Sequence, residues 1–296
     1  MTGILYLLGS LPLGLHRGFA RLLAWLLRKV FRYRTDVVTS NLSRCFPEKS
    51  SEEIARIRKR FYLHFASVFT EAVWFGACRG ERGRKRLKKS HIVEFSNPEE
   101  LNRLYGAAGQ MMLLQGHTGN WELIGGMGEY SYGEPFTYRT DRLGIAYLPL
   151  HNHFWDRVMA WNRRAAVEDL GFEGYIPSDR IIRFAYEHKD QNYAYWFDAD
   201  QYPYWEVGSM MIPFMNQPTR VMTGAAKLAC RLDMSVGYLR FRYREKGGYE
   251  VSVVPLTSRA GECKPEELIE QYYKLLEEDI REQPWNYLWS HKRWKG

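Results

Sequence analysis

The sequence has few cysteines and none of the short motifs that would give them a role. Its 4 cysteines (Cys45, Cys78, Cys230 and Cys263) are far apart, and no two of them form a CxxC pair. Dispersed cysteines argue against a zinc site and against a disulfide framework, and they suit a reducing compartment.

The chain also lacks a long apolar run free of charge. Residues 1–15 carry no charged side chain, but a helix that spans a membrane needs about 20 apolar residues. Extending the run to position 27 brings in a histidine and two arginines. No small-residue cleavage site follows, so we do not expect a removed signal peptide.

As one helix, residues 1–32 carry a narrow stripe of small and basic side chains on an otherwise apolar cylinder. This pattern predicts a membrane-associated helix whose arginines reach lipid phosphates. Whether it spans the membrane or lies on it is open, and an ordinary buried N-terminal helix is the alternative.

The 296 residues include 42 Lys+Arg against 34 Asp+Glu, a formal net charge of +8. Such a charge favours an anionic partner, which can be phospholipid, nucleic acid or an acidic substrate. No nucleic-acid-binding module is recognisable, so we expect no nucleic acid partner. Because basic residues follow the apolar N-terminus and cluster again at 79–90, we expect the body of the protein to lie in the cytoplasm.

From residue 33 onward, helical and strand patterns alternate without a dividing linker. The helical patterns cover residues 46–76 (with a capping box at Ser50 and Glu53), 154–171, 181–189, 219–232 and 264–282. The strand patterns cover residues 110–115, 136–140, 192–200, 209–215, 234–243 and 249–256. This alternation predicts one α/β domain over residues 33–296, with a central mixed sheet covered by helices.

The stretch QGHTGNWE is the strongest candidate for chemistry. His117 comes directly after a buried-looking strand, and Glu122 lies five residues later. Because residues 116–119 form a loop, the carboxylate of Glu122 can accept a hydrogen bond from Nδ1 of His117, which raises the basicity of Nε2. No GxSxG motif and no nearby cysteine offers a nucleophile. The pair therefore indicates direct general-base activation of a substrate hydroxyl or amine.

The stretch LLQGHTGNWELIGG resembles the corresponding segment of the late (lauroyl/myristoyl-type) acyltransferases of bacterial lipid A biosynthesis, a branch of the HxxxxD/E glycerolipid acyltransferases. The similarity spans most of the chain. Further matches are YRTDVVTSNLSRCFPEKS, Tyr138-Arg139, Asp200-Gln201, Thr223-Gly224 and the closing Trp289, His291 and Arg293-Trp294. The resemblance implies a glycerolipid-acyltransferase-like fold.

The mechanism that the resemblance implies begins when His117 deprotonates a lipid hydroxyl, which attacks an acyl thioester. Backbone N–H groups near Gly119 and Asn120, or the side chain of Arg139, would stabilise the oxyanion. Arg139 and Arg164 would otherwise hold a phosphate of the acceptor or of the pantetheine arm. The spacing of Arg164 to Gly171 departs from the family's pattern. No metal and no cofactor is required.

Two further site residues follow from the resemblance alone. Asp200 and Gln201 match the family's Asp-Gln pair at the end of a strand. Taken without the family, Asp198 and Asp200 look like a carboxylate pair for Mg²⁺, although acids at strand ends often cap helices or pair with arginine.

The sequence therefore predicts an inner-membrane acyltransferase of lipid A and lipopolysaccharide synthesis. Its partners would be acyl carrier protein or acyl-CoA, a lipid A precursor and membrane phospholipids, with the catalytic domain facing the cytoplasm. One alternative is another lipid acceptor: a phosphatidylinositol mannoside, an aminolipid or a lysophospholipid. The other is a non-catalytic membrane-binding relative, against which the intact His117 and Glu122 pair argues.

Overall fold

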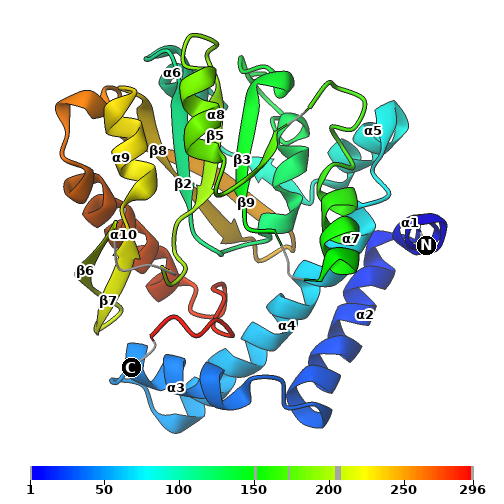
Figure 1. Ribbon diagram of the computed structural model, residues 1–296. Helices are drawn as coiled ribbons and strands as arrows, with labels where there is room; N and C mark the ends of the chain where they lie inside the picture. The colour runs from blue at the N-terminus through cyan, green and yellow to red at the C-terminus, as the bar shows by residue number, and fades with distance from the viewer. Residues whose placement is uncertain (1, 150–151, 173, 204–207, 295–296) are drawn as a thin grey trace.

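The computed structural model describes residues 2–149, 152–172, 174–203 and 208–294 (Figure 1). A seven-stranded sheet lies at its centre, in the order β1-β9-β8-β2-β5-β3-β4. Neighbouring strands run parallel except β8 and β9, which form an antiparallel hairpin. The strands of this sheet are β1 (Val93–Phe95), β2 (Met111–Gln115), β3 (Leu143–Tyr147), β4 (Tyr175–Pro177), β5 (Ala194–Asp198), β8 (Ser235–Tyr243) and β9 (Tyr249–Thr257). The predicted central mixed sheet is confirmed.

Helices cover both faces of the sheet, and β2 supplies both cores. Met112 and Leu114 pack into a core shared with α8, α9 and α10, whereas Met111 and Leu113 pack with α5, α6 and η2. Alternate residues of a strand point to opposite faces, so an unbroken apolar run is what a central parallel strand requires. The helices of these layers are α5 (Gly80–Ser90), α6 (Pro98–Gly106), η2 (Trp121–Glu129), α7 (His153–Arg163), α8 (Ile181–Glu187), α9 (Gly224–Arg231) and α10 (Pro265–Glu282).

The long helix α4 (Ser51–Phe75) runs along one side of the sheet, beside α2 (Leu13–Trp25) (Figure 1). Its start is the predicted capping box: Glu53 N–H donates to the Ser50 hydroxyl, and Ser50 N–H donates to the Glu53 carboxylate. Two reciprocal bonds satisfy backbone donors that a helix start leaves open. The remaining helical segments are α3 (Thr35–Cys45), η3 (Thr140–Arg142) and η4 (Ala260–Glu262).

The N-terminal helix is not continuous, which corrects the prediction of one helix over residues 1–32. It is divided into α1 (Thr2–Gly9), α2 and the π-helical turn η1 (Leu26–Val30). The break falls at Pro12, which precedes α2 and has no N–H to donate to a preceding turn. No helix of the described residues has both the length and the apolar character to cross a membrane.

Two other sequence predictions are wrong in detail. Residues 136–140 were expected as a strand, but the strand begins after η3 as β3. Residues 219–232 were expected as one helix, but their first part is β7 (Gln217–Met222), which pairs with β6 (Ser209–Phe214) in a separate two-stranded sheet, and α9 begins only at Gly224. The β-branched Thr219 and Val221 suit the strand that they form.

Candidate active site

His117 and two aspartates meet at one edge of the sheet. His117 follows β2, and Asp198 and Asp200 stand at and just beyond the end of β5, the strand beside it. Gln115 of β2 pairs in register with Asp198, so side chains that follow the two strands come together at their carboxyl ends. There Nδ1 of His117 lies 2.6 Å from Oδ1 of Asp200.

Asp200, not Glu122, orients the imidazole, which corrects the prediction of a bond between Glu122 and His117. Glu122 lies in the first turn of η2 and accepts two bonds from Arg163, at 2.7 Å from Nε and 2.8 Å from Nη2. The bidentate pair uses both carboxylate oxygens. Glu122 remains near enough to His117 to help raise the pKa of the imidazole.

The two aspartates make His117 strongly basic. Burial by itself lowers the pKa of His117, but Asp200 and then Asp198 outweigh it and raise the pKa to about 9. Burial also raises the pKa of Asp198, to about 6. For Asp200 burial works in the same direction, but the charge and hydrogen bond of His117 win and hold its pKa below the usual value. At neutral pH the site therefore holds an imidazolium between carboxylates. The fraction of His117 in the neutral form, which can act as a base, increases as the pH approaches 9.

The C-terminal segment closes around Asp200. Burial and then the charge of Asp200 raise the pKa of the Tyr287 hydroxyl, and the charge of Arg293 helps to lower the pKa of the Asp200 carboxyl group. Tyr287 also forms a β-bridge with Thr118, beside His117. Arg293 is only 2% exposed, and its Nη2 donates to the Tyr273 hydroxyl at 3.1 Å. These contacts give the closing Trp289-to-Trp294 segment a structural reason that the sequence did not reveal.

The Nε2 face of His117 is the side from which a substrate has to approach. The Gln201 side-chain nitrogen lies 3.1 Å from Nε2, and Oδ2 of Asp198 lies 4.0 Å from it. An amide can donate to a neutral ring nitrogen, or accept from a protonated one after its two ends exchange places. The ring of Trp121 stands edge-on to the imidazole, with the centroids 5.1 Å apart.

The Gly119 N–H and the Asn120 side chain are engaged elsewhere, so the structure does not offer the Gly119 N–H as the expected oxyanion donor. The Gly119 N–H donates to Oδ1 of Asn286 at 2.9 Å. The Asn120 amide donates to Oε2 of Glu71 at 2.9 Å, and its Oδ1 accepts from the Glu122 N–H at 3.3 Å. Both residues shape the loop that carries His117.

Substitution of Gly119 by alanine is expected to destabilise the fold. Gly119 has φ of +59°, and a Cβ at this position would overlap the Phe241 ring. Left-handed strain and overpacking together predict a loss of about 2–4 kcal/mol in the free energy of unfolding. Urea unfolding of Gly119→Ala checks this, with Gly106→Ala as the matched control because a Cβ at Gly106 meets no heavy atom within 4 Å. Equal losses in the two variants would contradict the assignment.

Two arginines predicted for the site lie outside it. Arg139 precedes β3, at the opposite edge of the parallel strands from His117, and forms a two-point ion pair with Asp141. Arg164 is exposed, whereas its neighbour Arg163 turns toward Glu122. Successive residues on a helix point about 100° apart, so a shift of one position changes the partner. Of the predicted residues, the structure brings together His117, Asp200 and Gln201.

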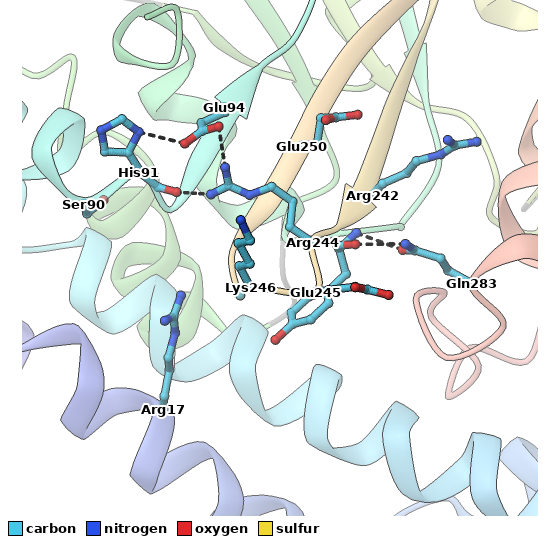
Figure 2. A pocket seen from close by; sticks show the side chains of 12 residues that line it. Arg17, Ser90, His91, Glu94, Arg242, Arg244, Glu245, Lys246, Glu250 and Gln283 are labelled. Carbon is cyan, nitrogen blue, oxygen red and sulfur yellow. Dashed lines mark hydrogen bonds and ion pairs between the residues drawn. The ribbon is translucent and has the colours of Figure 1, made fainter.

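Two surface cavities are prominent in the described part of the chain. The first, of about 620 Å³, lies between α2 and the β8–β9 turn and is lined by Arg17, Glu94, Arg244, Lys246 and others (Figure 2). The second, of about 580 Å³, lies between β6 and α10. His117 lines neither of them.

The family model described as bacterial lipid A biosynthesis acyltransferase matches residues 1–296, so it includes the N-terminal helices, the His117 loop and the C-terminal segment. No curated protein matches the chain.

Proposed function

The chain belongs to the bacterial lipid A biosynthesis acyltransferase family and is an acyltransferase; from this premise we propose that it transfers a fatty acyl group from an acyl thioester to a hydroxyl of a lipid A precursor. One observation carries the proposed mechanism. It is the 2.6 Å bond between Nδ1 of His117 and Asp200 at the carboxyl edge of the sheet. An imidazole fixed in this way presents Nε2 as a general base.

The proposed reaction needs no protein nucleophile. The acceptor hydroxyl displaces Gln201 from Nε2 of His117 and gives its proton to that nitrogen. The oxygen attacks the thioester carbonyl carbon, and the tetrahedral oxyanion then collapses with cleavage of the carbon–sulfur bond. The thiolate that leaves takes the proton from the imidazolium, which restores the base. Asp200 stabilises the imidazolium between the two proton transfers.

Glu122 takes part through Arg163. It holds Nε and Nη2 of the guanidinium, so Nη1 is the nitrogen that this carboxylate leaves for another partner. The Glu122 charge, working against burial, raises the pKa of Arg163. The charges of Arg163 and Asp198 also shift each other's pKa. A guanidinium held in this way is suited to the oxyanion or to a phosphate of the acceptor. The donor is acyl carrier protein or coenzyme A, which offer the same acyl thioester.

Product analysis tests the proposed reaction. The protein is incubated with acyl carrier protein or coenzyme A carrying a labelled acyl chain, together with a lipid A precursor, and the lipids are analysed by mass spectrometry. One new ester on the precursor is expected. A phosphatidylinositol mannoside, an aminolipid and a lysophospholipid are offered in parallel. Acylation of one of these alone would contradict the acceptor, and acylation of none would contradict the reaction.

The N-terminal segment provides the proposed membrane contact. Apolar side chains on α2, at the end of η1 and directly after it are each more than half exposed to solvent. They are Leu15, Phe19, Leu22, Trp25, Val30 and Phe31. Basic residues follow the same segment. An apolar face beside basic residues fits an anionic membrane surface. We place it on the inner (cytoplasmic) membrane, with the catalytic domain on the cytoplasmic side.

Three polar substitutions on α2 are expected to weaken membrane binding. With about half of each side chain already buried in the protein, Phe19, Leu22 and Trp25 each contribute roughly 1 kcal/mol of transfer. The triple change to serine is therefore expected to lower the partition onto anionic vesicles about 100-fold, measured by co-sedimentation. The matched control replaces Ile182 and Met211, which are similarly exposed on α8 and β6. Unchanged binding by the triple variant would contradict this surface.

A further inference from the structure

A carboxylate is buried in the middle of α4, beside the loop that carries His117. Glu71 is 2% exposed. Its Oε2 accepts from the Asn120 amide at 2.9 Å and from the Tyr249 hydroxyl at 2.8 Å. Nε of Arg17, on α2, is 3.9 Å from its Oε1. Burying a charge with one distant cation is costly, and burial raises the pKa of Glu71.

The bond to Glu71 decides which way the Asn120 amide faces. Ionised Glu71 can only accept, so Asn120 has to direct its NH₂ group toward Glu71. Its oxygen is thereby turned toward the Glu122 N–H, from which it accepts at 3.3 Å. Asn120 is the residue that caps η2, and it is fully buried. Its amide also lies 3.5 Å from the Val68 carbonyl oxygen, which belongs to α4 as well.

Asn120 lies between two residues of the proposed active site. His117 is three residues before Asn120, and Glu122, which holds Arg163, is two residues after it. A rotation of the Asn120 amide would release the first turn of η2 and shift Glu122 relative to the imidazole. Displacements of about 1 Å in a site can cost about 10²-fold in rate.

We propose that Glu71 is a positioning residue for acyl transfer: through Asn120 it fixes the loop from His117 to Glu122 against α4. The proposal rests on the proposed roles of His117 and Glu122.

Arg17 extends this connection to the N-terminal helices. It reaches up from α2 toward the turn at Lys246 and lines the cavity there (Figure 2). Gly247 allows this approach, because a Cβ on it would stand 3.3 Å from a guanidinium nitrogen of Arg17. The helix that bears the exposed apolar side chains is thus linked by charge to the residue that holds the catalytic loop.

A double-mutant cycle on the full chain tests the proposal. Steady-state acyl transfer is measured for Glu71→Ala, Asn120→Ala and the double variant, with kcat and KM for the acyl donor determined separately. Each single variant is expected to lower kcat about 10- to 100-fold and to change KM by less than about twofold. The double variant is expected to be no slower than about the slower single one, because Glu71 acts through Asn120.

Two more variants separate positioning from general support of the fold. Glu71→Gln keeps an acceptor oxygen for Asn120 and is expected to recover most of the kcat that Glu71→Ala loses; if the alanine variant does not fold, this variant and Asn120→Ala carry the test. Tyr249→Phe removes the other hydrogen bond to the same carboxylate. It is the matched control and is expected to keep the wild-type kcat, although its thermal midpoint falls.

The results that would overturn the proposal are distinct from those that would overturn the function. A folded Glu71→Ala protein with kcat within twofold of wild type, multiplicative losses in the double variant, or an equal loss of kcat in Tyr249→Phe would each overturn the positioning role. Absence of acyl transfer by the wild-type protein would overturn the function instead. In that case the positioning role of Glu71 is still tested by the NMR signal of the His117 ring, which is assigned by its loss in a His117 variant. It should shift in Glu71→Ala and not in Tyr249→Phe, and an unshifted signal in Glu71→Ala overturns the positioning role.

Discussion

Replacing His117 with glutamine is expected to lower kcat by about 10²–10⁴-fold, the contribution of a well-placed general base. Glutamine can still donate a hydrogen bond to Asp200, so the buried carboxylate keeps a partner and the fold is retained. It cannot take a proton from a hydroxyl. The measurement is steady-state acyl transfer at fixed pH, together with the thermal midpoint as a check on folding.

His91→Gln is the matched control for this variant. His91 is exposed, bonds to Glu94 and lines the cavity of Figure 2. It is expected to leave kcat near the wild-type value. A folded His117→Gln protein that retains more than about a tenth of the wild-type rate would exclude His117 as the base.

Asp200→Asn is expected to have the next largest effect, a loss of about 10²–10³-fold in kcat. Asparagine can face the ring with its amide nitrogen as a donor, which stabilises the wrong tautomer of His117. It also removes the charge that does most to raise the pKa of His117. The neutral imidazole then forms at lower pH.

The pH dependence of kcat/KM shows whether Asp200 raises the pKa of His117. In the wild-type protein, kcat/KM should rise tenfold per pH unit and level off near pH 9, where His117 loses its proton. In Asp200→Asn the same rise should level off at lower pH and at a lower maximum. Asp198→Asn is the matched comparison: it also removes a charge that raises the pKa of His117, but Asp198 does not bond Nδ1. It should shift the profile to lower pH and keep most of the maximum. Superimposable profiles for wild type and Asp200→Asn would contradict the dyad.

The sequence did not predict features that depend on pairing between distant segments of the chain. The apolar run before His117 and the alternation of helices and strands predicted β2 and the central sheet, because both signals are local. The partner of Nδ1 is not local. It depends on β5 pairing beside β2 with Gln115 opposite Asp198, and nothing in either strand specifies that register. Proximity along the chain favoured Glu122, but three-dimensional proximity favours Asp200.

The errors elsewhere have similar causes. The family's pattern indicated Arg164, but Arg163 is the residue that faces Glu122, because the packing of α7 on α4 and η2 sets the rotation of the helix about its axis. Glu71 is a case in which the sequence pattern does point to a special residue. Val68 and Ala72 are buried residues of α4, and the carboxylate of Glu71 lies between them in the sequence and is buried too. A charge on a buried face requires partners, and here they are Asn120 and Tyr249, with Arg17 3.9 Å away.

An NMR titration of the His117 ring nitrogens in the intact chain tests directly whether Asp200 orients His117 as a base, with His117→Gln to assign the signals. We expect a pKa of about 9 and, in the neutral ring, a proton on Nδ1 and none on Nε2. A pKa at or below about 6.5, the ordinary value of a histidine, or a neutral ring protonated on Nε2, would contradict this expectation.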